Sequence, residues 1–182
     1  MPEDMKARFE EDILETTITN LVIANRILAR EDVIDDFGHV SVRNPLNHER
    51  YFISRSRSPE VVTRGDIMEF TLDGELIGND HRRPYAERHI HGAIYKDRPD
   101  VNAVTHHHAR SILPFTMNAI SLRPIFHMSS VIGRRLRPGT ARSNSATPIC
   151  SSIQWRWGIR CHEHLGESGC SASRAWVCLR SG

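Results

Sequence analysis

Hydrophobic periodicity extends over the first part of the chain and stops near residue 132. Apolar residues recur at helical spacing over residues 4–30, which predicts a long amphipathic helix. Residues 133–182 show no sustained period of either kind. In a chain of 182 residues, we therefore expect one folded domain over residues 1–132 and an aberrant, disordered tail over residues 133–182.

Short segments with strand-like alternation follow the first helix. They predict antiparallel hairpins, formed by residues 39–43 with 51–54 and by residues 67–72 with 75–77. A second helix is expected over residues 85–96, because the following Arg98-Pro99-Asp100 stops it. Residues 101–106 return to strand alternation. Helices that alternate with hairpins predict an α/β layered domain.

Charge and composition divide the chain at the same place. Residues 1–130 carry 16 basic and 20 acidic side chains, whereas residues 131–182 carry 8 Arg, no Lys and 2 Glu. All 4 Cys and all 3 Trp lie after residue 149. No segment is long and apolar enough to cross a membrane, and the acidic N-terminus does not resemble a signal peptide. We therefore expect a cytoplasmic protein, in which the cysteines are reduced.

Three consecutive histidines end the strand predicted over residues 101–106. His106 and His108 share one face because side chains alternate along a strand, and His107 points to the other face. Two imidazoles on one face of a strand often bind one metal ion together, with each nitrogen about 2.0–2.1 Å from zinc. Glu87 begins the preceding helix, so its carboxylate is expected near this face, where it could bind the ion or move protons. The alternative is a set of exposed histidines and an acid that only stabilises the start of the helix.

The sequence around these residues resembles the class II aldolase/adducin family. The resemblance rests on E-R-H-I-H-G-A-I-Y-K-D-R-P-D-V-N-A-V-T-H-H-H, and also on F-G-H-V-S-V-R-N-P and S-R-S-R-S-P-E earlier in the chain. It covers roughly residues 10–132 and implies a layered fold with a central, mainly antiparallel sheet flanked by helices. Glu87 then matches the catalytic acid/base of the family. His106 and His108 match two of three histidines that bind a divalent metal (zinc, manganese or iron), and His107 matches a position that is not a ligand.

The substrate differs among branches of this family. Sugar-phosphate aldolases hold phosphate with two serines before the catalytic Glu, whereas this chain has Pro84-Tyr85-Ala86 there. Arginine side chains suit carboxylates. The resemblance therefore favours the branch of lyases that decarboxylate hydroxylated aromatic or pyridine carboxylic acids, and a small-molecule carboxylate as the partner. The candidate substrate-binding residues are His39, Arg55, Ser56, Arg57 and Ser58.

Other interpretations of the folded part stay open. The loop of Arg55 to Ser58 is alternatively a solvated basic turn. A sugar-phosphate aldolase or epimerase is the second enzymatic candidate, and a non-enzymatic, adducin-like binding domain is the third. The resemblance also implies a homotetramer for an intact family member.

Two interpretations compete for residues 133–182. The first is a genuine Arg- and Cys-rich tail, but its cysteines form no C-x-x-C pair, and no periodicity gathers its arginines on one face, so we expect no nucleic-acid partner. The second is a family C-terminus translated out of frame. Allowed codons for residues 169–178, read one base later, give V-V-A-L-R-G-H-G-C, in which the His arises across Ala175 and Trp176. We favour the second, and expect a truncated sheet with an uncovered edge, no third histidine ligand, weak metal binding and impaired activity.

Overall fold

The computed structural model describes residues 2–111, 114, 125–127, 153–154 and 175–180. The helices are α1 (Glu3–Arg30) and α2 (Arg88–Asp97), with two short 3-10 turns at Pro59–Val61 and Arg64–Asp66. The strands are β1 (His39–Arg43), β2 (Arg50–Ser54), β3 (Ile67–Thr71), β4 (Val101–His107), β5 (Ile153–Gln154) and β6 (Ala175–Arg180).

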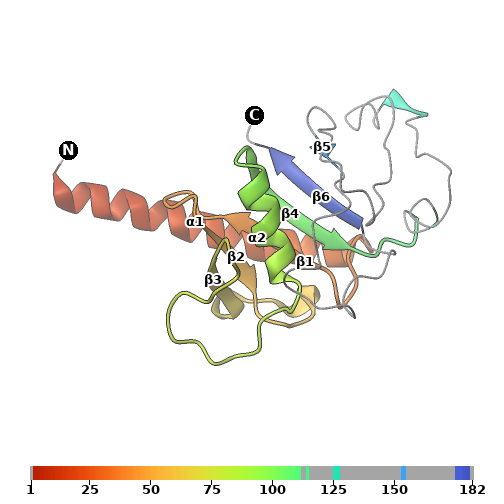
Figure 1. Ribbon diagram of the computed structural model, residues 1–182, viewed down its shortest axis with the longest axis horizontal. Coiled ribbons are helices and arrows are strands. Elements are labelled where there is room, and N and C mark those ends of the chain that lie inside the picture. Colours follow the sequence, from red (N-terminus) through yellow and green to blue (C-terminus); the bar gives the residue numbers. More distant parts are fainter. Residues whose placement is uncertain (1, 112–113, 115–124, 128–152, 155–174, 181–182) are drawn as a thin grey trace.

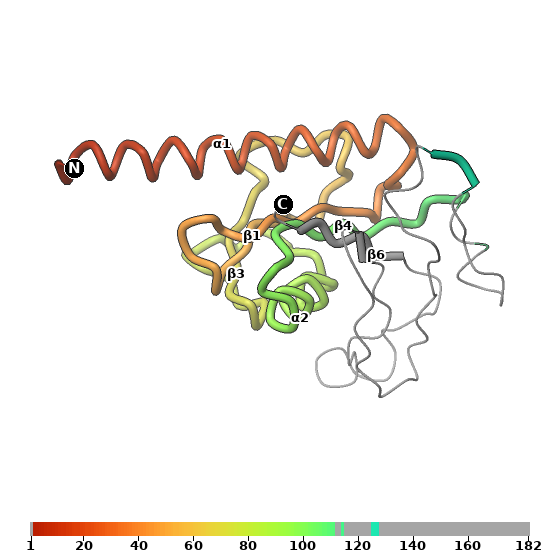
Figure 2. Tube along the Cα trace, turned by 90° about the horizontal axis from the view of Figure 1, so that it is seen from above, coloured from red at the N-terminus to blue at the C-terminus, as the bar shows by residue number. Residues whose placement is uncertain are grey.

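The strands form one sheet in the order β3-β2-β1-β4-β6-β5. Every neighbouring pair in that order is antiparallel. The two helices cover opposite faces of the sheet, and Figure 2 shows the strands between α1 and α2. The α/β layered fold with an antiparallel sheet is therefore confirmed.

Helix α1 matches the predicted amphipathic helix to within one residue. Its buried face packs on one side of the sheet, in a cluster formed by Leu21, Ile34, Val40 and Phe52. The amide of Asn25 ties the helix to β1, because its side chain accepts a hydrogen bond from the Val40 backbone at 3.3 Å. The N-terminal turns extend beyond the sheet (Figure 1). Within the described part of the chain, no helix is both long and apolar enough to cross a membrane.

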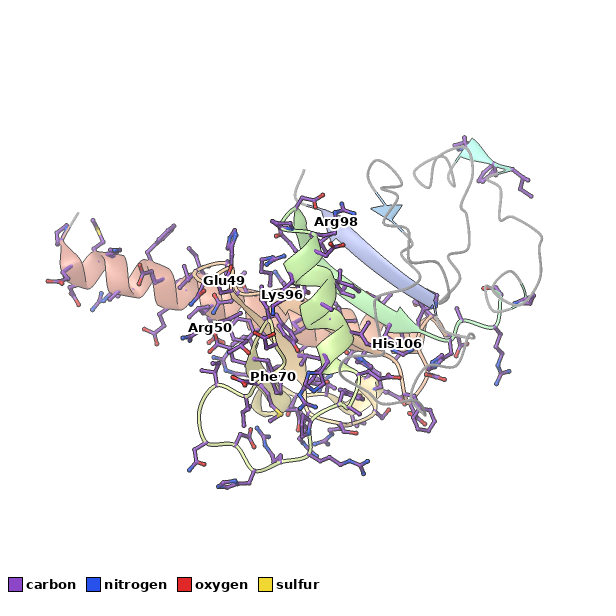
Figure 3. The ribbon with its side chains drawn as sticks, in the orientation of Figure 1. Glu49, Arg50, Phe70, Lys96, Arg98 and His106 are labelled. Carbon is purple, nitrogen blue, oxygen red and sulfur yellow. The ribbon has the colours of Figure 1, made fainter. Side chains whose placement is uncertain are left out.

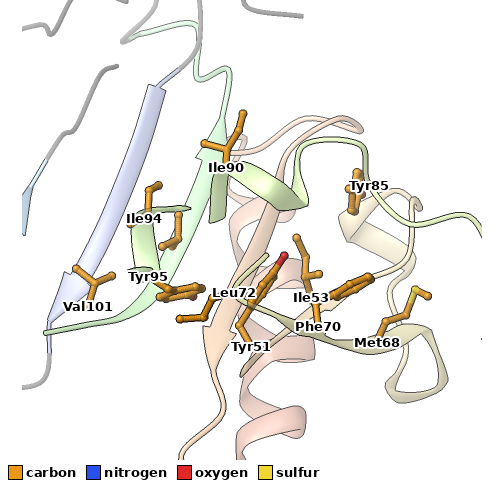
Figure 4. Packing of buried hydrophobic residues seen from close by; sticks show 11 residues of the cluster. Tyr51, Ile53, Met68, Phe70, Leu72, Tyr85, Ile90, Ile94, Tyr95 and Val101 are labelled. Carbon is orange, nitrogen blue, oxygen red and sulfur yellow. The ribbon is translucent and has the colours of Figure 1, made fainter. Parts of the chain in front are cut away.

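The larger core cluster lies between the other face of the sheet and α2 (Figure 4). Tyr51 and Tyr95 are almost fully buried in it, and their rings lie 5.5 Å apart. Gly92 lets α2 approach the chain just beyond β3, since a Cβ at this position would lie 2.2 Å from the Leu72 carbonyl oxygen. This close approach fixes the height at which α2 sits above the sheet.

Three predicted boundaries differ from the structure. Residues 75–77 do not form a strand, and only Leu76 pairs with β3, through an isolated bridge to Phe70. Helix α2 begins at Arg88 rather than at residue 85, because Tyr85 instead stacks on a β1 side chain. Strand β4 continues to His107, one residue further than predicted.

The expectation of an uncovered sheet edge beside β4 is wrong. Strand β6 pairs with β4 over most of its length, and β5 pairs with β6 in turn (Figure 1). The backbone of the C-terminal part therefore does extend the sheet. The rest of the predicted disordered tail lies outside the described residues.

Candidate metal centre

The candidate centre forms where β1 and β4 pair. His39, the first residue of β1, is directly opposite His106 near the end of β4. Residues opposite each other on antiparallel strands share a face and lie close together. Both side chains are fully buried, and their ring centroids lie 5.0 Å apart. The strand register thus places His39, which the sequence assigned to substrate binding, beside a predicted metal ligand.

Glu87 joins these two histidines from the start of α2. Its Oε2 atom lies 3.0 Å from Nδ1 of His106. One ligand atom each from His39, Glu87 and His106 lie within 4.8 Å of one another. Figure 3 shows His106 beside the first turn of α2, which explains how the carboxylate reaches the strand. The described residues therefore contain a cluster of two imidazoles and one carboxylate.

His108 completes the cluster from beyond the end of β4. Its Nε2 atom lies 2.9 Å from Nε2 of His106, so the structure brings the two predicted ligands together. Nδ1 of His108 faces the Asp35 carboxylate, with both oxygens at 3.1 Å. Burial alone would raise the pKa of Asp35, but the hydrogen bond and charge of His108 help to lower it.

Burial determines the charge of the inner histidines. It lowers the pKa of His106 to about 3, with a smaller contribution from the neighbouring His108. It also lowers the pKa of His91, which packs behind the cluster, well below the ordinary value of 6.5. Neutral imidazoles carry a free lone pair on one nitrogen, which is the form that binds metal ions.

A buried polar chain supports the cluster from behind. The Ser41 hydroxyl lies 2.6 Å from Nδ1 of His91 and 2.8 Å from the Tyr95 hydroxyl. The His91 ring in turn lies 4.9 Å from the His39 ring. Arg43 closes this layer, because its guanidinium donates to the carbonyls of Tyr95 and Val101. These hydrogen bonds hold β1, β4 and α2 in one arrangement under the candidate site.

The predicted substrate-binding loop reaches the cluster through Tyr85. The Tyr85 ring stacks on His39 with centroids 4.1 Å apart. Its hydroxyl donates to the carbonyl of Arg57 and accepts from the Arg57 backbone N–H at 3.3 Å. The loop also bonds elsewhere, since Ser56 N–H donates to Arg83 and the Ser58 hydroxyl donates to Asp36.

The two arginines of this loop are already paired with a carboxylate. Arg55 Nε lies 2.6 Å and Arg57 Nη1 lies 3.2 Å from Oδ1 of Asp66, which is buried. Burial alone would raise the pKa of Asp66, but hydrogen bonds from Thr63 and Arg55 lower it well below its usual range. Both arginine side chains stay about one third exposed, at 30% and 35%. Asp66 therefore fixes the loop and leaves part of each guanidinium accessible.

The donor set suits a divalent metal ion. Imidazole nitrogens favour zinc, iron and related ions, and an added carboxylate also admits manganese. His39 is oriented for this purpose, since its Nδ1–H donates a hydrogen bond to the Phe37 carbonyl at 3.0 Å. Its Nε2 then carries the lone pair. These residues therefore fit the divalent metal ion that the sequence resemblance implied.

Comparison with known proteins decides the family. The family model described as the class II aldolase and adducin N-terminal domain matches residues 19–165. The chain belongs to this family. The match runs past residue 132, where hydrophobic periodicity stops.

Two curated relatives are decarboxylases. The chain is 39% identical over 109 residues to decarboxylase tropJ of Talaromyces stipitatus, covering 59% of this chain and 41% of the relative. It is 30% identical over 131 residues to 3,4-dihydroxyphthalate decarboxylase of Arthrobacter keyseri, covering 65% and 51%. The chain therefore spans about half the length of the curated relatives it matches.

A solved structure agrees with this assignment. L-fuculose 1-phosphate aldolase from Glaciozyma antarctica is 28% identical, with a TM-score of 0.53, over 59% of this chain and 47% of that one. The class II aldolase-like fold is thus confirmed, and relatives of the chain are lyases of both the decarboxylase and the aldolase type.

The sequence did not single out several residues that build this centre. Among them are Asp35, Ser41 and Tyr95, and the last two carry no local signal that marks them as parts of a site. Their roles depend on which strands and helices meet, which local periodicity does not specify. A usable signal for Asp35 was its place in Asp35-Asp36-Phe37-Gly38, because acidic residues before a strand often bond the following backbone N–H groups.

Proposed function

We propose that this chain derives from a divalent-metal-dependent carbon–carbon lyase that decarboxylates a hydroxylated aromatic or pyridine carboxylic acid. The observation that carries the proposal is the convergence of His39, Glu87 and His106 within 4.8 Å, with His108 beside them. His39, His106 and His108 would hold the ion, and Glu87 would lie beside it. A bound divalent ion would polarise a substrate oxygen and stabilise the negative charge that develops when carbon dioxide leaves.

Glu87 is the group that would move the proton. Its side chain contacts the buried His106 and is 19% exposed, so it is also accessible from solvent. Decarboxylation breaks the bond between the ring carbon and the carboxyl carbon, and the electron pair stays on the ring carbon. Glu87 in its acid form would donate a proton to that carbon and regain one from water. The proposed catalytic role of Glu87 rests on this position.

The substrate assignment rests on the decarboxylase relatives and on the basic loop. The loop of Arg55 to Ser58 contacts Tyr85, which stacks on His39, so it lies beside the cluster. The partly exposed guanidiniums of Arg55 and Arg57 could receive a second carboxylate or a phenolate of the substrate. The same positive charge suits a sugar phosphate, which keeps aldol cleavage as the second candidate.

A direct assay can separate these two activities. The purified chain would be supplied with zinc, manganese or iron and incubated with 3,4-dihydroxyphthalate or with L-fuculose 1-phosphate. We expect slow release of carbon dioxide from the first and no aldehyde from the second. Faster cleavage of the sugar phosphate would favour the aldolase. A chain that takes up none of the three metals would contradict the lyase proposal altogether.

Two variants test the residue roles in that assay. Glu87→Gln should keep most of the metal affinity and abolish carbon dioxide release, because the amide cannot carry the proton. His39→Ala should lose metal affinity if His39 is a ligand, whereas an unchanged metal affinity with a raised KM would restore its original assignment to substrate binding.

We further propose that residues 133–182 derive from a family C-terminus translated out of frame, which leaves the activity impaired. The register supports this, since β6 pairs Trp176 with His106 and Ala175 with His107. The alternative frame would place a histidine at this point. Sequencing the gene from codon 130 onward tests the proposal, because an intact frame without R-G-H-G would contradict it.

Assembly and location stay predictions. A homotetramer is expected for an intact family member, and light scattering of the purified chain would show whether this chain still assembles. A cytoplasmic location is expected as well, and fractionation of cells that express the tagged chain would test it.

A further inference from the structure

The Asp35 carboxylate occupies a fixed position between α1 and β1. Its Oδ1 accepts hydrogen bonds from the backbone N–H groups of Phe37 at 3.1 Å and Gly38 at 2.9 Å. Both of its oxygens lie 3.1 Å from Nδ1 of His108. The carboxylate is therefore held by the backbone on one side and faces an imidazole on the other.

The turn that carries Asp35 has little room to shift. A Cβ at Gly38 would lie 2.6 Å from Cβ of Ile34 and 3.0 Å from the carbonyl oxygen of His106. The turn thus packs directly on the strand that carries the histidines. A carboxylate on such a turn keeps a constant position relative to His106 and His108.

The chemistry of the pair determines which nitrogen of His108 holds the proton. An ionised carboxylate only accepts hydrogen bonds, so the nitrogen that faces it must be the donor. In a neutral imidazole, the other nitrogen then carries the lone pair. For His108 that nitrogen is Nε2, which points at Nε2 of His106 across 2.9 Å.

We propose that Asp35 is a positioning residue that fixes the tautomer and orientation of His108 for metal binding. The inference rests on the proposed metal-dependent function, because it concerns how one proposed ligand is prepared. Carboxylates that accept the second N–H of a metal-binding histidine act in this way at many sites. Asp35 itself does not touch the metal or the substrate.

Zinc affinity, measured by competition with a chromophoric chelator, gives the first test. Asp35→Ala should weaken zinc binding about 10- to 100-fold, the usual loss when such a partner is removed. Asp35→Asn should lose less, since its amide oxygen can still accept a hydrogen bond from Nδ1 of His108 and from the backbone N–H groups of the turn. The matched control is Asp36→Ala, whose carboxylate instead accepts from the Ser58 hydroxyl and should leave zinc affinity unchanged.

Nitrogen-15 NMR of the metal-free chain gives the second test. At pH 8 the His108 ring should carry its proton on Nδ1 in the wild type and should redistribute it toward Nε2 in Asp35→Ala. An Nε2-protonated His108 in the wild type would overturn the inference. So would an Asp35→Ala variant with wild-type zinc affinity.

The two tests keep this inference separate from the proposed function. A wild-type chain that binds no zinc contradicts the metal-dependent function, while the tautomer measurement still decides the role of Asp35. If Asp35→Ala loses the fold by circular dichroism, the wild-type tautomer still decides the question, because a His108 ring protonated on Nε2 would contradict the role of Asp35.

Discussion

His106 and His108 direct their Nε2 atoms at each other across 2.9 Å, at the end of β4. Each of the two rings also has a carboxylate at its Nδ1, Glu87 for His106 and Asp35 for His108. If both Nδ1 atoms carry their protons, both Nε2 atoms carry lone pairs that point at each other. Such a contact is stable only when a proton or a metal ion lies between the two nitrogens. This arrangement adds His108 to the group of His39, Glu87 and His106 as a further candidate ligand.

Removal of either ring should therefore weaken metal binding severely. His106→Ala and His108→Ala should each lower zinc affinity by more than about 100-fold. This loss exceeds the one expected when only the hydrogen-bond partner of a ligand is removed. His107→Gln is the matched control, because the His107 ring is buried and its Nδ1 accepts from the Ala109 backbone at 3.2 Å. Isothermal titration with zinc would measure all three. Equal losses for His106 and His107 would contradict the assignment of ligands.

Stability should depend on pH through Asp66. Its pKa in the folded chain is lowered, whereas in the unfolded chain it should lie near about 3.9. The carboxylate therefore contributes stability above about pH 4, and this contribution is lost as the pH falls toward the folded value. Asp66→Asn should cost about 1.5–3 kcal/mol at pH 7, typical of lost hydrogen bonds to a charged group.

Urea denaturation at pH 7, 5, 4 and 3 would measure the effect. The difference between the wild type and Asp66→Asn should shrink below about pH 4, since protonation removes the same charge. Asp73→Asn serves as the comparison, because Asp73 pairs with Lys96 on the exposed surface and should contribute less than about 1 kcal/mol. A difference that grows on acidification would have the wrong sign for this explanation.

Local sequence patterns were sufficient to predict the helices and strands, but not to predict which of their side chains lie together in the fold. The α1 helix and the strands β1 to β4 match the predictions closely because periodicity reports which face of each element is buried. The place of His39 opposite His106 depends on strand register, which joins distant parts of the chain and is set by the whole packed sheet. The ion pairs of Asp66 with Arg55 and Arg57 also depend on the folded chain, because the sequence shows these arginines only as a basic loop.

The prediction of an uncovered edge failed for a related physical reason. Residues 133–182 have no sustained hydrophobic period, which predicts no further strand, but strands pair through backbone hydrogen bonds. The segment Ala175–Arg180 forms an antiparallel pair with β4. Backbone pairing needs an extended chain and an open edge rather than a particular side-chain pattern.

Gly92→Ala should destabilise the chain although alanine favours helices. In an ordinary helix interior, the change would gain about 0.8–1.0 kcal/mol. Here the new Cβ would lie 2.2 Å from the carbonyl oxygen and 2.9 Å from the carbonyl carbon of Leu72, and neither can rotate away. Overpacking of this kind costs about 1–3 kcal/mol. Thermal unfolding would measure it, with Ala93→Gly to calibrate the helix propensity at the next position. A more stable Gly92→Ala variant would show that α2 can move outward freely.

The last prediction concerns position 176. In the antiparallel register, Trp176 is opposite His106, and opposite residues have Cβ atoms about 4.5–5.5 Å apart on the same face. A histidine introduced there would add a nitrogen donor on the face that carries His39, Glu87 and His106. Trp176→His should therefore raise zinc affinity by about tenfold or more, since an added imidazole would offer one more ligand to the same ion.

The matched control for that variant is Val177→His, because residue 177 is opposite Thr105, and successive positions of a strand alternate between the two faces of the sheet. Competition titrations of the two variants and the wild type would be compared under the same conditions. A gain at 176 and none at 177 would also agree with an out-of-frame origin of the C-terminal part, because the alternative frame places its histidine at this register. An equal gain in both variants would show that the added imidazole binds zinc without the β4 histidines, and an unchanged affinity in Trp176→His would show that the centre does not extend across β6.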